Sequence, residues 1–154
     1  MAKPLLLLDS FLPYRLSFTS NLVSDVIAST YETLFALRIP DWRVIAVAAE
    51  NPDGITQQEI GLRTRMDKVT VSRAAIALID RGLVARRPIS GDRRSHLLYL
   101  TPAGRELYRT VAPKALDLER QIFSEFPKED LVRFEAMLRR IDQIVADLEI
   151  NNAN

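Results

Sequence analysis

The fold of this chain is decided by residues 67–104, DKVTVSRAAIALIDRGLVARRPISGDRRSHLLYLTPAG. Asp67 is a suitable N-cap for a helix of small and apolar residues, and Gly82 is a suitable left-handed stop for it. Two β-rich runs follow at 83–89 and 95–100, separated by a basic loop. The stretch therefore predicts a helix followed by a β-hairpin.

A shorter helix is expected just before Asp67. Thr56 and Glu59 have the spacing of a capping box, and the helix that they begin runs out near Thr64. Only about four residues connect it to the next helix. Two short helices joined so tightly are typical of a helix-turn-helix.

Longer helices are expected on both sides of this motif. Proline positions and apolar spacing predict helices from Pro13 to about Leu37, from Pro40 to about Glu50, after Thr101-Pro102 with a kink at Pro113, and after Pro127. The last helix carries a narrow apolar stripe: Leu131, Phe134, Leu138, Ile141, Val145 and Leu148. The stripe fits packing within the chain's own core or along a partner's helix, and we favour the partner.

The composition is that of one globular domain, with 154 residues of which 47% are hydrophobic and 27% charged. Apolar stretches such as Leu5–Leu8 and Val44–Ala49 are far shorter than the roughly 20 residues that cross a bilayer. The first is also too short for a secretory signal. Because there is no cysteine, disulfides and thiol chemistry are excluded. We expect a cytoplasmic protein without membrane contact, in which only the tail 151–154 is disordered.

Positive charge is concentrated in the middle of the chain. Residues 63–109 contain 11 basic and 4 acidic side chains, a net charge of +7, whereas the rest of the chain carries −6. This asymmetry indicates one surface that meets a polyanion, although a solvated, charge-rich face is the plainer alternative.

The helix after Asp67 has two contrasting faces. Val71, Ala75 and Leu78 recur at steps of four and three and are expected to face the core. The opposite side of the first two turns presents the candidate DNA-reading residues Lys68, Val69, Thr70, Ser72 and Arg73. No acidic residue occurs between Asp67 and Asp80. Short polar, basic and apolar side chains of this kind fit the major groove, where arginine or lysine reads guanine and valine or threonine contacts the thymine methyl.

The hairpin loop offers a second contact with DNA. Gly91 is followed by Asp92, Arg93 and Arg94, which place two guanidinium groups on a projecting turn suited to the minor groove or its phosphates. We expect Asp92 to pair with the Arg94 guanidinium and hold its orientation. The alternative is a solvated turn without a binding role.

Residues 67–104 resemble the core signature of the multiple antibiotic resistance regulator (MarR) family of winged-helix transcription factors. The resemblance rests on the D-x-R of the loop, Gly82-Leu83-Val84, and the L-T-x-x-G that ends at Gly104. It implies a mainly α protein with a small β-hairpin wing, a winged helix-turn-helix with long terminal dimerisation helices. Residues 1–154 would form one such domain, 40–100 its DNA-binding module, and 11–38 and 101–150 its dimerisation helices.

The same resemblance implies that Lys68, Val69, Thr70, Ser72 and Arg73 read the major groove. Arg94 then takes the minor-groove position, oriented by Asp92. Val69 departs from the family, which commonly has a polar residue there. The expected partner is a DNA duplex with a near-palindromic sequence, which a homodimer of this chain binds. We expect the protein to act as a repressor rather than as an activator.

Family members usually lose DNA affinity when a small aromatic acid, thioester or related metabolite binds between the dimer helices and the winged module. Our candidates for such an effector site are Arg15, Tyr31, Trp42 and Arg43, because an aromatic wall with a guanidinium suits an aromatic carboxylate. Core packing for Trp42 and a surface ion pair for Arg15 are the alternatives.

We expect no catalytic residue, metal site or cofactor. His96 is the single histidine, and no nucleophile elbow, phosphate-binding glycine loop or paired-carboxylate motif accompanies it. Two rival functions stay open. One is a winged-helix adaptor that binds protein rather than DNA; the other is a small enzyme with an unrecognised site.

Overall fold

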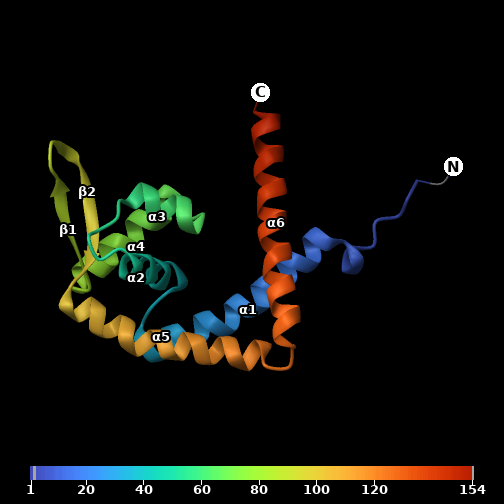
Figure 1. Ribbon diagram of the computed structural model, residues 1–154, viewed down its shortest axis with the longest axis horizontal. Coiled ribbons are helices and arrows are strands. Elements are labelled where there is room, and N and C mark those ends of the chain that lie inside the picture. Colours follow the sequence, from blue (N-terminus) through green and yellow to red (C-terminus); the bar gives the residue numbers. More distant parts are fainter. Residues whose placement is uncertain (2, 154) are drawn as a thin grey trace. The chain divides into compact units, whose positions relative to one another are not determined.

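The computed structural model describes Met1 and residues 3–153. The chain divides into two compact units, Met1–Lys114 and Ala115–Asn154. The first unit contains η1 (Leu8–Ser10), α1 (Leu12–Phe35), α2 (Ile39–Glu50), α3 (Gln57–Thr64), α4 (Lys68–Asp80), β1 (Val84–Ile89), β2 (Asp92–Leu100) and the first part of α5 (Pro102–Phe123). The second contains the end of α5 and α6 (Lys128–Asn152). The predicted mainly α fold with one β-hairpin is confirmed (Figure 1).

Helix α1 ends where Ala36 adopts a left-handed conformation, with φ of 49°. A side chain distant in sequence caps this end of α1. The Arg81 guanidinium donates hydrogen bonds to the backbone carbonyl oxygens of Ala36 at 2.9 Å and Phe35 at 3.2 Å. Basic groups at this position also interact favourably with the negative end of the helix dipole. Arg81 thus joins the end of α4 to the end of α1.

Helix α2 begins with a charged capping box. Asp41 is only 4% exposed, and it accepts from the backbone N–H of Arg38 at 3.0 Å and from the Arg38 guanidinium. A buried carboxylate needs such partners. The ion pair and Pro40 together fix the start of the helix.

The helix-turn-helix is formed as predicted. Thr56 and Glu59 make the reciprocal hydrogen bonds of a capping box at the start of α3. Asp67 caps α4 by accepting from the Thr70 N–H at 2.7 Å. Between the two helices, Arg65 adopts a left-handed conformation, with φ of 53°.

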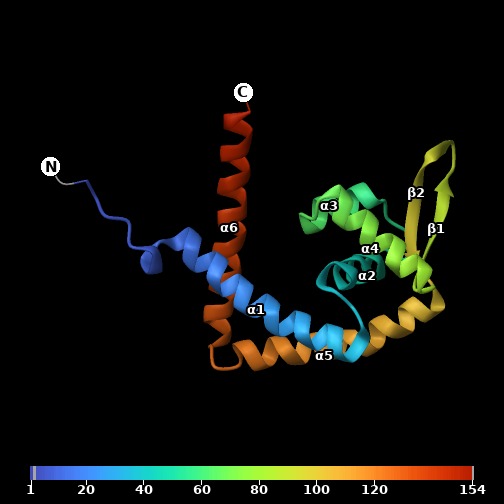
Figure 2. The ribbon, with the colours of Figure 1, turned by 180° about the vertical axis from the view of Figure 1, so that it is seen from behind.

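The core of the first unit lies beneath α4. Val71, Ala75 and Leu78 are all buried, which confirms their predicted inward face. Aliphatic side chains that are almost completely buried pack in the same core from other elements. Among them are Val44 and Ile45 of α2, Ile60 of α3, Leu98 of β2 and Val111 of α5. The view from behind shows α2, α3 and α4 gathered beside the base of the hairpin (Figure 2).

The hairpin has a tighter turn than the sequence indicated. Residues 90–94 were predicted as a loop, but β2 already begins at Asp92, so only Ser90 and Gly91 form the turn. Gly91 has a φ of 85°, which explains the glycine. β1 and β2 pair antiparallel from Val84↔Leu100 onward, and the register shifts beside Pro88.

Tight backbone contact ties the base of the hairpin to α5. Thr101 accepts from the Gly104 N–H at 3.0 Å and donates to the Gly82 carbonyl at 2.6 Å. A Cβ added to Gly104 would lie 1.9 Å from the Leu83 carbonyl oxygen. Glycine at this position therefore lets α5 start directly against the hairpin.

In the second unit, α6 starts after Pro127, as predicted, and continues to Asn152. The expected disorder of residues 151–154 is therefore wrong for Asn151 and Asn152, which are helical; Asn154 lies outside the described residues. No described residue of α6 is buried. Its apolar stripe is left half-exposed or exposed in the single chain.

Candidate nucleic-acid interface

The outward face of α4 is centred on three exposed residues, Val69, Arg73 and Ile76. They lie four and three residues apart, which puts them on one side of a helix. Val71, Ala74, Ala75 and Leu78 occupy the opposite, buried side. The face carries a guanidinium between two aliphatic side chains.

Lys68 and Thr70 flank this face, and Ser72 lies beside Arg73. Lys68 is exposed, whereas Thr70 and Ser72 are half-buried. The hydrogen bond from the Thr70 N–H holds the pKa of Asp67 below its ordinary value, with a smaller contribution from the charge of Arg73. Asp67 therefore stays ionised and engaged with the backbone at neutral pH.

The hairpin tip is ordered by Asp92 in a different way from the one expected. Its carboxylate accepts from the backbone N–H of Arg94 at 2.9 Å, not from the guanidinium. This bond, followed by one from the Ser95 side chain, lowers the pKa of Asp92. The predicted pairing with the guanidinium is thus corrected to a local turn bond, because the side chain spans only two residues at the tight turn. Arg93 and Arg94 are both exposed.

The root of the hairpin is anchored by contacts that the sequence did not indicate. The Arg87 guanidinium donates to the carbonyl of Asp53, in the turn between α2 and α3, and lies 5.6 Å from the centre of the Tyr99 ring. Ile55 forms a β-bridge with Leu98. These contacts join the hairpin to the helices, and the hairpin projects away from them (Figure 1).

Two of the four effector candidates meet in the structure. Tyr31, which is 3% exposed, packs edge-on to Trp42 with ring centres 5.6 Å apart. Trp42 also stacks on Tyr108, with ring centres 5.7 Å apart. Burial raises the pKa of Tyr31. Sequence reasoning missed Tyr108, which has no motif around it.

The two arginine candidates are not part of this aromatic cluster. Arg15 lies 16 residues before Tyr31 on α1, about 24 Å at 1.5 Å per residue, and its guanidinium lies 5.0 Å from the Phe18 ring centre. Arg43 is exposed on α2. The described residues therefore bring Tyr31 and Trp42 together without a guanidinium stacked on either ring.

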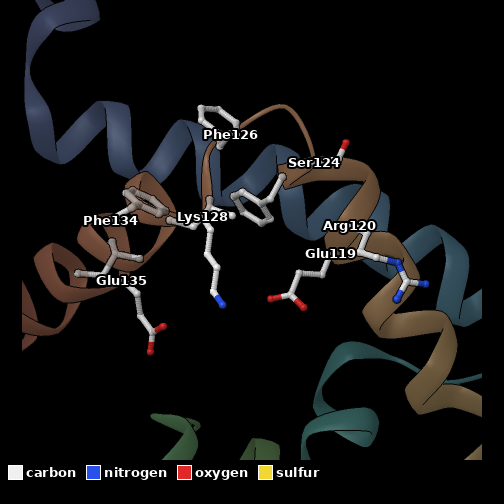
Figure 3. A pocket seen from close by; sticks show the side chains of 10 residues that line it. Glu119, Arg120, Ser124, Phe126, Lys128, Phe134 and Glu135 are labelled. Atoms are coloured by element: carbon white, nitrogen blue, oxygen red, sulfur yellow. The ribbon is translucent and has the colours of Figure 1, made fainter.

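Cavities occur elsewhere in the described residues, and two of them have volumes of about 500 Å³. One, of about 510 Å³, lies in the turn between α5 and α6, where Phe123, Phe126 and Phe134 form its wall. Lys128 and Glu135 point toward the same side of that turn (Figure 3). The other, of about 500 Å³, lies between α3 and the start of α4. Neither is lined by an effector candidate.

The described residues lack two features that other functions would require. No group of three or more histidine and acidic side chains is placed to hold a metal ion in that part of the chain. Among the same residues, no helix combines the length and the apolar character needed to span a membrane. His96 is half-buried on β2, opposite Pro88.

Comparison with known proteins links this geometry to one family. Residues 37–95, which span α2, the helix-turn-helix and the start of β2, match the MarR family model. Among curated proteins, the HTH-type transcriptional regulator PecS of Dickeya dadantii is 30% identical over 92 residues. The alignment covers 60% of this chain and 55% of PecS, so this chain spans little more than half of that relative.

Solved structures share the fold over most of the chain. A MarR/EmrR family transcriptional regulator from Acinetobacter sp. ADP1 is 22% identical with a TM-score of 0.84, covering 92% of this chain and 99% of that one. CouR from Rhodococcus jostii RHA1, solved bound to p-coumaroyl-CoA, is 22% identical with a TM-score of 0.79, covering 88% and 94%. The resemblance to the MarR family is confirmed, and so is the winged helix-turn-helix fold.

Proposed function

We propose that this chain, whose residues 37–95 carry the MarR-family pattern, is a DNA-binding transcriptional regulator. The observation that carries the proposal is the pairing of two cationic projections on one unit. These are the outward face of α4 and the tip of a hairpin anchored to the same helices. Such a pair fits the major groove and the neighbouring minor groove of a duplex.

In this proposal, α4 enters the major groove with Lys68, Val69, Thr70, Ser72 and Arg73 toward the bases. Arg73 is exposed at the centre of the face, so its fork can reach guanine O6 and N7. The half-buried Thr70 and Ser72 contribute short polar contacts at the edges of the face.

The hairpin supplies the second contact. Arg94 and Arg93 carry exposed guanidinium groups, which suit the narrow minor groove and its phosphates. Asp92 orders the turn through its bond to the Arg94 backbone. Its role is therefore to fix the path of the chain at the tip, which leaves the Arg94 guanidinium available to DNA.

The working form is proposed to be a homodimer that binds a near-palindromic site. Exposed apolar side chains run along α1 and α6, among them Leu12 and Leu16 on α1 and Phe134 and Ile141 on α6. Exposed apolar side chains in such number along each of the two helices favour association with a second copy. Two copies of α4 related by a two-fold axis would read half-sites about 34 to 36 Å apart.

We further propose that the regulator is a cytoplasmic repressor released by a small aromatic acid or its thioester. CouR, which shares the fold, was solved with an aromatic thioester, p-coumaroyl-CoA. In this chain the aromatic cluster of Tyr31 and Trp42 is the candidate wall, with the exposed Arg43 as the candidate cationic partner, because Arg15 lies too far along α1 to reach these rings.

The test is selection of duplexes from a random pool, followed by binding measurements on the enriched sequence. We expect a near-palindrome, bound by two copies of the chain, with affinity that falls steeply as salt is raised. A panel of aromatic acids and thioesters is then added to measure release. Failure to enrich any sequence, or capture of a protein but no duplex, would reject DNA binding in favour of an adaptor.

A further inference from the structure

Ile76 extends the DNA-facing surface of α4 beyond the two turns that sequence reasoning considered. At 100° per residue, Val69, Arg73 and Ile76 fall within a narrow arc opposite the buried side chains. Val69 is 57% exposed and Ile76 51%. The helix therefore presents an aliphatic, cationic, aliphatic series along its outer side.

The exposure of two β-branched residues on this face needs a reason. Such residues are weaker helix formers than the glutamate, lysine or glutamine common on solvent-facing helix positions. Exposed to water, they gain nothing from burial. A ligand with apolar groups at matching positions would cover both side chains and explain their presence.

The spacing of the series matches stacked bases. Along a helix that rises 1.5 Å per residue, Val69 and Arg73 are about 6 Å apart and Arg73 and Ile76 about 4.5 Å apart. Base pairs repeat every 3.4 Å or so, and the whole series thus covers about three base-pair steps. Asp80 is exposed one turn beyond Ile76, and the DNA phosphates would repel its negative charge. The contact between α4 and DNA is therefore expected to end before Asp80.

The thymine C5 methyl is the apolar group that the major groove displays. We infer that each half-site contains a guanine read by Arg73 between two thymines, whose methyl groups are covered by Val69 and Ile76. The inference rests on the proposed function and specifies the bases that the same site takes. Ile76 becomes a specificity-determining residue of the reading helix.

Replacing single thymines by deoxyuridine tests this directly, because uracil lacks the methyl but keeps every hydrogen-bonding group. With the selected duplex, we expect two thymines per half-site, on either side of the guanine, at which the change weakens binding about fourfold. That factor is the burial of one methyl, about 0.8 kcal/mol, at 1.4 kcal/mol per tenfold. Other thymines should tolerate uracil.

Two variants assign each methyl to its side chain. Ile76→Ala should abolish the thymine-to-uracil effect at one of the two positions and keep it at the other, and Val69→Ala should do the reverse. Val132→Ala on α6 is the matched control, since Val132 is 61% exposed, lies in the other unit and outside the apolar stripe of α6, and should leave both effects unchanged. Circular dichroism checks that all three variants fold.

The outcomes separate this inference from the function on which it rests. A tightly bound duplex that tolerates uracil everywhere would overturn methyl reading and leave DNA binding intact. Persistence of both methyl effects in Ile76→Ala would likewise overturn the assignment to Ile76. If no duplex is selected at all, the proposed function fails before the methyl test begins.

Discussion

Replacing Arg94 by alanine removes one of the two positive charges at the hairpin tip that we propose contact DNA. The carboxylate of Asp92 is engaged with the backbone, so the exposed Arg94 guanidinium is available to a phosphate. Each phosphate contact contributes about 0.9 to the slope of log K against log salt. Because a dimer carries two copies, Arg94→Ala should make that slope shallower by about 1.8. Between 50 and 200 mM salt, the variant then loses about tenfold less affinity than the unsubstituted protein.

Fluorescence anisotropy of a labelled duplex at four salt concentrations measures this slope. Arg139→Ala is the matched control, because Arg139 already pairs with Glu135 at 2.7 Å on α6 and should leave the slope unchanged. Arg94→Lys should keep the slope because the charge is kept. Arg94→Ala should also weaken binding evenly across sequences. An unchanged slope in Arg94→Ala would refute a phosphate contact at the hairpin tip.

Three further substitutions probe other parts of the structure. Arg73→Ala should cost about 1 to 3 kcal/mol of binding and relax specificity at one base pair, measured by competition among single-base variants of the site. Gly104→Ala should lower the melting temperature, since its Cβ would meet the Leu83 carbonyl oxygen at 1.9 Å, an overpacking that costs about 1 to 3 kcal/mol or more. Asp67 has a folded pKa below its ordinary 3.8, so its contribution to stability is present above that value and lost as pH falls through the folded pKa. Asp67→Asn keeps a cap acceptor without titrating, and its melting temperature should therefore fall less than that of the unsubstituted protein between pH 5 and pH 2.

Features set by neighbours in the chain could be predicted from sequence. The caps at Thr56 and Asp67 join groups only three residues apart, so their spacing alone specifies them. The inward face of α4 follows in the same way from helical periodicity. The same periodicity puts Ile76 on the outward face of α4. We did not include it there from the sequence because we considered only the first two turns of the helix.

The hairpin tip marks the limit of local reasoning. The predicted pairing of Asp92 with the Arg94 guanidinium is wrong, because the Asp92 carboxylate accepts from the backbone N–H of Arg94 instead. The difference follows from the length of the turn, which holds two residues where five were expected. In so tight a turn the nearest donor to a carboxylate is the main chain.

Contacts between distant segments could not be predicted. Trp42 stacks on Tyr108, and Arg87 reaches the Asp53 carbonyl, only because several helices pack around a shared core. A single sequence contains no signal for such pairs, since neither spacing nor composition links them. The separation of Arg15 from Trp42 has the same origin: both residue types suited an aromatic acid, but α1 holds the arginine far from the ring.

The bonds from Arg81 have a mechanical consequence. The planar guanidinium of Arg81 donates to two consecutive backbone carbonyls, those of Phe35 and Ala36 at the end of α1. The backbone N–H of the same residue donates into the last turn of α4. Small tilts of α1 must therefore carry the reading helix with them, or stretch both bonds at once. Because the Arg81 side chain is exposed, water competes for both hydrogen bonds, which makes this connection easier to open than the buried contacts of the core.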